Sequence, residues 1–250
     1  MAATPVVSIP AITREEAEGL ATQEFTRLVE LLRSLAPGDW SRPTDCPLWD
    51  VRAMVGHSVG MMTDFTSYRG LVRRMRAATK DSKASGGALI DSMTALQVAD
   101  NADLPIEELV GRAAEEGPKA ARWRAKVNPA FRRIPMKQEV GDHVETWRWS
   151  YLLDVILTRD PWMHRVDIAR ATGRQLVLTA DHDGRIVADV VAEWARRHGQ
   201  PFTLSLTGPA GGEFVAGEGG EDITIDAVEF CRTLSGRAEG RGLLGQEMPF

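Results

Sequence analysis

The sequence predicts a mainly α-helical protein in which a helical bundle is followed by a small α+β domain. In the first 175 residues, long stretches carry apolar side chains at helical spacing, and 24 basic residues nearly balance 23 acidic ones. From Leu176 onward the chain has 6 arginines, no lysine, 12 acidic residues and 12 of the 23 glycines. A change in both charge and glycine content is typical of a domain boundary. We therefore assign residues 1–175 to the bundle and residues 176–250 to the second domain.

The expected helices of the first domain have recognisable ends. Thr13 followed by Glu16 forms a capping-box pattern that begins the first helix, and Pro37-Gly38 ends it. The remaining elements follow in order: a helix over about 49–75, a loop over 80–87, helices over 88–99 and 105–127, an irregular segment over 128–150, and a helix over 151–171. Four or five helices joined by short links predict an antiparallel bundle.

The second domain changes its pattern. Short apolar segments are separated by glycine-rich turns, which indicates strands. The expected strands cover 176–178, 202–206, 213–216 and 222–225, and the expected helices cover 183–198 and 227–235. This mixture predicts a small α+β domain.

The composition excludes several classes of protein. With 43% hydrophobic and 26% charged residues, the chain is typical of a folded protein that buries a core. Its net charge of −5 argues against a nucleic-acid partner, because phosphate binding requires a clustered basic surface. No run approaches the roughly 18 apolar residues of a membrane span, and the N-terminus lacks a secretion signal. We therefore expect a cytoplasmic protein with no membrane partner. The two cysteines, Cys46 and Cys231, are too few for a disulfide framework.

The first candidate site lies near the end of the bundle. Asp160 and His164 are four residues apart, so on a helix they project from one face, and Asp167 stays near that face. A carboxylate and an imidazole at this spacing can bind one divalent metal ion, and His57, in an apolar helix, is the best placed third ligand. Two histidines and one carboxylate leave coordination positions open, as in catalytic zinc sites and some iron sites.

A purely structural interpretation of these residues stays open. Asp160 before Pro161 is also a good helix N-cap followed by a first-turn proline. His57 equally fits a hydrogen-bonded core histidine, and Asp167 fits an ion pair with Arg165 or Arg170. Spacing alone does not choose between the two interpretations.

A second candidate overlaps the first. Residues 56–60 match the G-x-S-x-G pattern of a serine-hydrolase nucleophile elbow, with Ser58 as the nucleophile. That turn needs a strand before it, whereas the preceding residues have helical spacing, so this hypothesis is the weaker one. Arg237 follows the last expected helix and fits either an anion-binding residue or a cap of that helix end. Cys46 has no nearby base in the sequence that would mark it as a nucleophile.

Several stretches together resemble one known family. Residues 40–52, leading to His57, resemble the N-terminal signature of the mycothiol-dependent maleylpyruvate isomerase family, within the DinB-like superfamily. Residues 159–173 resemble its second signature, and residues 233–237 with the closing Pro249-Phe250 resemble its C-terminal part.

The resemblance implies a DinB-like four-helix bundle followed by a small domain similar to sterol carrier proteins. It implies a divalent metal ion, zinc, held by His57, Asp160 and His164, with mycothiol as thiol cofactor and a small electrophile of the maleylpyruvate type as substrate. Family members usually have Glu where this chain has Asp160. A catalytic arginine of the family's C-terminal domain is matched to Arg237, and Asp167 is assigned to orient His164.

Three other functions stay open beside the isomerase. The same site fits a mycothiol S-transferase with another substrate range. It also fits a non-enzymatic, DinB-like metal-binding or regulatory module. The hydrolase with Ser58 as nucleophile is the third.

Overall fold

The computed structural model describes residues 3–140 and 143–250, and the chain forms two compact units. One unit is Thr13–Gln175, and the other combines the residues up to Ile12 with Leu176–Phe250. The change in charge and glycine content predicts that residues 1–12 belong to the bundle. Residues 3–12 lie in the other unit, where strand β1 (Thr4–Pro5) pairs in parallel with strand β5 (Gly212–Ala216) of the C-terminal sheet.

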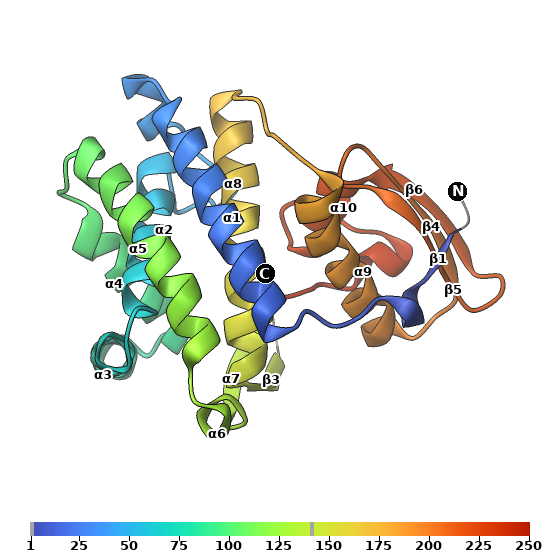
Figure 1. The fold of residues 1–250 in the computed structure, drawn as a ribbon, viewed down its shortest axis with the longest axis horizontal. Helices are drawn as coiled ribbons and strands as arrows, with labels where there is room; N and C mark the ends of the chain where they lie inside the picture. The colour runs from blue at the N-terminus through green and yellow to red at the C-terminus, as the bar shows by residue number, and fades with distance from the viewer. Residues whose placement is uncertain (1–2, 141–142) are drawn as a thin grey trace. The chain divides into compact units, whose positions relative to one another are not determined.

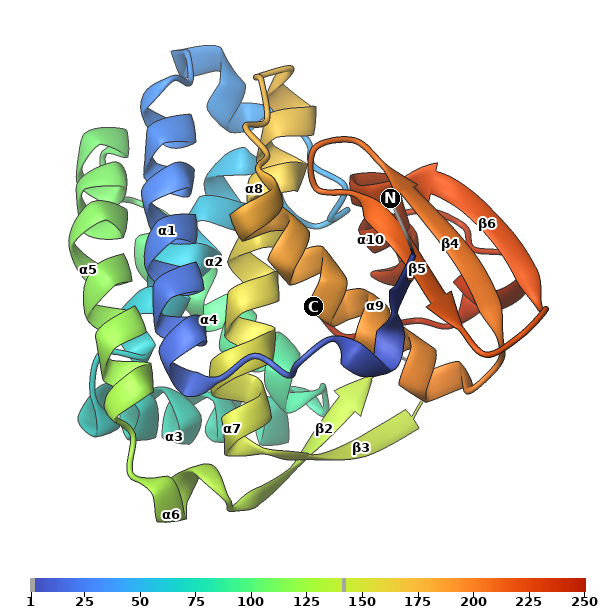
Figure 2. The ribbon, with the colours of Figure 1, turned by 45° about the vertical axis from the view of Figure 1, so that its right-hand side comes forward.

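Four long helices of the first unit form a closed ring in which each contacts two others. In ring order they are α1 (Arg14–Arg33), α5 (Ile106–Lys126), α2 (Val51–Asp64) and α8 (Leu157–Thr172). Helix α1 runs antiparallel to α5, and α2 runs antiparallel to α8 (Figure 1 and Figure 2). The chain passes from α2 to α5 through α3 (Tyr68–Ser85) and α4 (Leu89–Asn101), and α4 packs on both α2 and α3. The predicted mainly helical fold with a four-helix bundle is confirmed.

The predicted start of the first helix is also confirmed. Thr13 Oγ1 accepts a hydrogen bond from the Glu16 backbone N–H (3.2 Å), and a Glu16 carboxylate oxygen accepts one from the Thr13 N–H (3.4 Å). The inner faces of the ring are apolar, and their fully buried side chains form the core of this unit: Phe25, Leu28, Met54, Met62 and Leu109.

Two expected boundaries in the bundle are wrong. The single helix expected over 49–75 is two helices, because α2 ends at Asp64 and Ser67 caps α3 by accepting a hydrogen bond from the Gly70 N–H (3.1 Å). The loop expected over 80–87 is largely helical: α3 continues to Ser85 and ends at Gly86, whose φ of +74° suits a residue without a Cβ.

The segment expected to be irregular over 128–150 contains regular structure. It holds helix α6 (Pro129–Arg132), the antiparallel strands β2 (Pro135–Val140) and β3 (His143–Arg148), and the short helix α7 (Trp149–Tyr151). The strand side chains are mostly exposed, so no apolar alternation marks them in the sequence. After α7, a π-helical turn over Leu152–Ile156 leads into α8.

The second unit is a four-stranded sheet with two helices. The strand order is β1, β5 (Gly212–Ala216), β4 (Phe202–Thr207) and β6 (Glu221–Asp226), with β4 antiparallel to β5 and parallel to β6. Trp194 of α9 (Arg185–His198) packs against Phe202 of β4 and against Phe230 of α10 (Ala227–Leu234). The strand expected over 176–178 is absent, and Val177 is 58% exposed. No helix in the described ranges is long and apolar enough to cross a membrane.

Candidate metal centre

His57 lies on the buried face of α2 and is 6% exposed. The side chain of Asp50 caps the start of this helix. Farther along the helix, the side-chain amide of Asn101 on α4 donates a hydrogen bond to the Gly56 carbonyl oxygen (2.9 Å). The backbone next to His57 is thus held by α2's own cap and by a neighbouring helix.

Asp160, His164 and Asp167 all lie on α8, which is one helix from Leu157 to Thr172. The interpretation of Asp160 as an N-cap is wrong, because the residues before it are already helical. Asp160 and His164 therefore keep the one-turn separation that the sequence predicts.

Helix α8 continues through Pro161, and a side chain of α5 supplies the hydrogen-bond donor that the proline lacks. Proline has no N–H, so the Leu157 carbonyl, four residues earlier, lacks its usual intrahelical donor. The Nη1 atom of Arg124 donates a hydrogen bond to that carbonyl (2.5 Å). Arg124 is only 2% exposed, and burial lowers the pKa of its guanidinium to about 10, so it stays protonated at neutral pH. A buried cation thus replaces the missing backbone donor.

Three predicted ligands from two helices converge. Asp160 Oδ1 lies 3.6 Å from His57 Nε2 and 3.3 Å from His164 Nε2. One donor atom from each of the three residues lies within 4.8 Å of the others. Ligand atoms bound to one zinc ion at about 2.0–2.2 Å lie roughly 3.4 Å apart in tetrahedral geometry. The donor set and its spacing therefore fit a divalent ion with only small adjustments.

Two buried polar atoms of the cluster support this interpretation. Asp160 Oδ2 and His57 Nδ1 have no hydrogen-bond partner among the described residues. An unpaired buried polar atom is costly, and in native structures it usually indicates a missing ligand or water, or a functional role. His57 is therefore not the fully hydrogen-bonded core histidine of the structural interpretation.

The charges of the cluster are strongly coupled. Burial acts to raise the pKa of the Asp160 carboxyl, but the His164 and His57 rings hold that pKa well below its ordinary value. Burial acts to lower the pKa of His164, but the Asp160 and Asp167 carboxylates raise it to about 9. The carboxylates therefore favour positive charge on the His164 ring.

Asp167 contacts the far side of the His164 ring. Its Oδ2 lies 3.4 Å from His164 Nδ1, while His164 Nε2 faces Asp160. In the structural interpretation Asp167 pairs with Arg165 or Arg170. In the structure, Arg165 donates to Glu24 (2.6 and 3.1 Å), and Arg170 lies 3.6 Å from Asp45. A carboxylate on the second nitrogen of a ligating histidine is the arrangement that fixes its tautomer and ring orientation in metal sites.

Two further residues lie beside the cluster, and no spacing in the sequence indicates them. The Trp49 ring stacks on His57, with centroids 4.8 Å apart. Cys46, which has no nearby base in the sequence, lies with its Sγ within 4.8 Å of donor atoms of His164 and Asp167. Both residues lie in the stretch of 40–52 that carries the family resemblance, but helical spacing does not relate them to α8.

Arg237 lies in the other unit, just after α10. Its backbone N–H donates to the Arg232 carbonyl (2.9 Å), and Gly236 before it has a φ of +75°. These are the features of a helix C-cap, so the backbone of Arg237 has the capping role. The role of its side chain stays a prediction.

The serine-hydrolase hypothesis is wrong. Residues 56–60 lie entirely inside α2 rather than in a strand-to-helix turn. Ser58 is fully buried, and its hydroxyl donates to the Met54 carbonyl (3.0 Å). A hydroxyl held this way has neither the exposure nor the strained turn that a nucleophile elbow needs.

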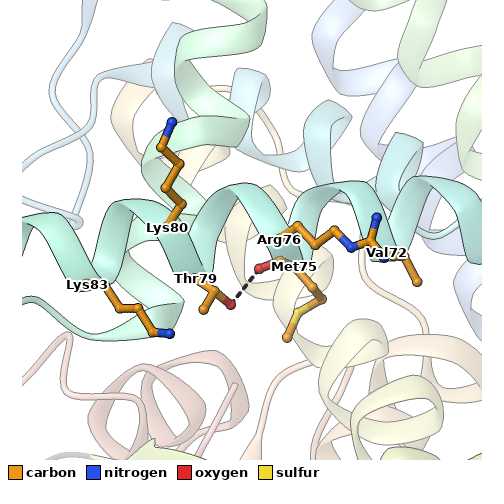
Figure 3. Close-up of a pocket in the computed structure, with 6 residues that line it drawn as sticks. All are labelled: Val72, Met75, Arg76, Thr79, Lys80 and Lys83. Atoms are coloured by element: carbon orange, nitrogen blue, oxygen red, sulfur yellow. Dashed lines mark hydrogen bonds between the residues drawn. The ribbon is translucent and has the colours of Figure 1, made fainter.

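A separate groove lies along α3, away from these residues in the sequence. It has a volume of about 470 Å³, and all six lining residues shown in Figure 3 come from this one helix. Its hydroxyl group, on Thr79, donates to the Met75 carbonyl (2.7 Å). Among the described residues that line the groove there is no carboxylate, imidazole or thiol, so the candidate chemistry stays with the His57 cluster.

Fold and site together define a helical-bundle protein with a candidate metal centre of two histidines and one carboxylate. The family model described as the mycothiol maleylpyruvate isomerase N-terminal domain matches residues 21–169, and the chain belongs to this family. The matched range contains His57, Asp160, His164 and Asp167, whereas Arg237 lies outside it.

Two solved structures share the fold. One is the mycothiol-dependent maleylpyruvate isomerase, with 16% identity and a TM-score of 0.55. The other is a histidine-to-alanine variant of a mycothiol-dependent maleylpyruvate isomerase, with 15% identity and a TM-score of 0.55. Each match covers 94% of this chain and 92% of the other. No curated protein matches the sequence.

Proposed function

We propose that the protein is a divalent-metal enzyme, with zinc as the ion, that uses a low-molecular-weight thiol on a small electrophilic substrate. The observation that carries this proposal is the convergence of His57 Nε2, Asp160 Oδ1 and His164 Nε2 beside two buried polar atoms without partners. Family membership supports mycothiol as the thiol and a substrate of the maleylpyruvate type.

His57, Asp160 and His164 would hold the ion and leave a coordination position open. When bound, the ion would stabilise the incoming thiol as its thiolate. With the ion bound in place of their protons, two neutral imidazoles and one carboxylate contribute a single negative charge, so the ligand set does not cancel the charge of a divalent ion. The residues therefore favour an anionic sulfur over a neutral ligand.

The proposed reaction is a cis–trans isomerisation by reversible addition. The sulfur bonds to one alkene carbon while the alkene electron pair moves to the conjugated carbonyl oxygen. Rotation about the former alkene carbon–carbon bond follows, and the enolate electron pair then re-forms the double bond as the carbon–sulfur bond breaks and the thiolate leaves. Asp167 would keep His164 Nε2 turned toward Asp160 throughout, since it contacts Nδ1. Arg237 is proposed to neutralise a carboxylate of the substrate.

Metal content is the direct test of the ligand set. We expect one equivalent of metal in the purified protein and a large loss in His57→Ala and His164→Ala. His143→Ala is the matched control, because His143 is an exposed histidine outside the three-residue cluster. Metal retained in both ligand variants would contradict the proposal. A metal-loaded protein without thiol-dependent turnover would favour the binding or regulatory module instead.

The mycothiol S-transferase is the second candidate, and the side chain at position 160 bears on it. The family resemblance implies a Glu where this chain has Asp160, whose carboxylate reaches one methylene less far from α8. A product assay with mycothiol separates the two activities: an isomerase regenerates free thiol, whereas a transferase consumes it. If the shorter side chain limits isomerisation, Asp160→Glu should increase isomerase turnover without loss of metal.

A further inference from the structure

Cys46 lies in a tight turn beside the cluster. The Thr44 hydroxyl oxygen accepts a hydrogen bond from the Cys46 N–H (3.2 Å), and the Trp49 N–H donates to the Cys46 carbonyl (2.9 Å). Residues Pro43 and Asp50 are paired across the base of this turn. The turn leaves Cys46 partly exposed to solvent.

The His164 ring has a donor set on each side. Its Nε2 faces Asp160 and belongs to the set with His57. Its Nδ1 faces Asp167, and a second set consists of Cys46 Sγ, one nitrogen of His164 and an Asp167 oxygen, all within 4.8 Å of one another. His164 and Asp167 are almost completely buried, so an ion would reach this set from the side of Cys46.

The two sets differ in chemical softness. The first has only nitrogen and oxygen donors, whereas the second adds sulfur. Thiolate ligands favour soft, thiophilic ions, zinc included, whereas carboxylate ligands favour harder ions, so a very thiophilic ion should prefer the second set over the first. Bonds of about 2.3 Å to sulfur and about 2.0–2.1 Å to nitrogen place ligand atoms of one zinc-sized ion roughly 3.5 Å apart. His164 Nδ1 and Asp167 Oδ2 already lie 3.4 Å apart.

We propose that Cys46, His164 and Asp167 form a second metal site that takes thiophilic divalent ions such as Cd²⁺. Binding there uses Asp167 as a ligand, so it withdraws the carboxylate that orients His164 for the first set. A thiophilic ion would therefore act as an inhibitor at a place distinct from the open coordination position.

Cadmium titration of the full chain tests this proposal, because a cadmium–thiolate bond has an ultraviolet charge-transfer band that nitrogen and oxygen ligands lack. We expect the band in the unmodified protein and at least a tenfold loss of its intensity in Cys46→Ser. Cys231→Ser is the control, since Cys231 is fully buried in the other unit, and it should keep the band. A band that persists in Cys46→Ser, or that disappears in Cys231→Ser, overturns the proposal.

Two further variants distinguish a failure of this proposal from a failure of the proposed function. Asp160→Asn removes a donor of the first set only, so it should weaken zinc binding and leave the cadmium band in place. Asp167→Asn should weaken the cadmium band. If Asp160→Asn abolishes the band while Asp167→Asn leaves it unchanged, the second site is excluded, whatever the outcome for zinc. Circular dichroism of each variant establishes that it is folded.

Discussion

The indole ring of Trp49 lies stacked on the imidazole ring of His57, with 4.8 Å between ring centroids and 28° between ring planes. Trp49 is also tilted toward the His164 ring, with centroids 5.9 Å apart. The next residue, Asp50, caps α2. One short segment therefore begins the helix that carries His57 and covers the face of that histidine.

Removing this stacked ring should weaken metal binding. In Trp49→Ala the His57 ring is free to rotate, and we expect zinc affinity to fall roughly tenfold, the lower end of the effect of losing a residue that orients a ligand. Trp49→Phe keeps an aromatic face and should lose much less. Competition with a chromophoric chelator measures the affinity. Zinc binding in Trp49→Ala as tight as in the unmodified protein would contradict the expectation.

Arg124 and Pro161 should be energetically coupled through the Leu157 carbonyl. In Arg124→Met that carbonyl loses its donor, and an unpaired buried acceptor costs about 1–3 kcal/mol. In Pro161→Ala the new backbone N–H can satisfy the same carbonyl from within α8. The arginine substitution should therefore cost less in the alanine background.

A double-mutant cycle by urea unfolding measures this coupling. We expect a coupling energy of about 1 kcal/mol, in the direction that makes the double variant more stable than the sum of the single changes. Strict additivity would show that Arg124 does not act as the substitute donor.

Two glycines within helices test how closely the helices pack, because one lies against a neighbouring helix and the other faces open space. A Cβ at Gly60 of α2 would lie 2.6 Å from the Gln97 Cβ of α4, whereas a Cβ at Gly111 of α5 would meet nothing within 4 Å. Gly60→Ala should destabilise the protein by about 1–3 kcal/mol because the helices must separate. Gly111→Ala should stabilise it by about 0.5–1 kcal/mol through helix propensity. Urea unfolding of both variants measures the difference, and equal effects would contradict the close contact of α2 with α4.

The buried Asp39 carboxylate should make stability depend on acid pH. Hydrogen bonds from the Arg174 side chain (2.7 Å) and the Ala36 backbone N–H (2.9 Å) lower the pKa of Asp39. A lowered carboxyl pKa adds stability above the unfolded value of about 3.9, and that stability is lost as the pH falls through the folded value.

Asp39→Asn removes this contribution. The free-energy difference between the unmodified protein and Asp39→Asn should be largest near neutral pH and should shrink as the pH falls below about 4. Urea unfolding at several pH values measures it. A difference that stays constant with pH would exclude Asp39 as its source.

The sequence predicts those parts of the fold whose signals are local. The bonds between Thr13 and Glu16 begin α1 where the capping-box pattern indicates. The break at Phe65–Ser67 was missed because apolar residues continue beyond it at helical spacing. Strands β2 and β3 were missed because their exposed side chains do not alternate between apolar and polar.

The candidate site likewise has a part that local sequence spacing predicts and a part that it does not. Four-residue spacing relates Asp160 to His164, since both lie on one helix, but the position of His57 depends on how α2 packs against α8. Trp49 and Cys46 reach the same place through a non-helical turn, and no periodicity predicts where a turn folds back. The apolar helix around His57 and the family resemblance both indicate His57 as the third ligand, whereas the proximity of Trp49 and Cys46 is visible only in the folded chain.

The π-helical turn at Leu152–Ile156 determines the direction, about the helix axis, in which the side chains of α8 project. A π turn holds one residue more than an α turn, so it rotates the rest of the helix by about 100° relative to an uninterrupted α-helix. Deleting one residue there would turn Asp160 and His164 together, with their mutual spacing intact, away from His57. A single deletion there would thus take the centre apart while all three ligand residues stay in the sequence.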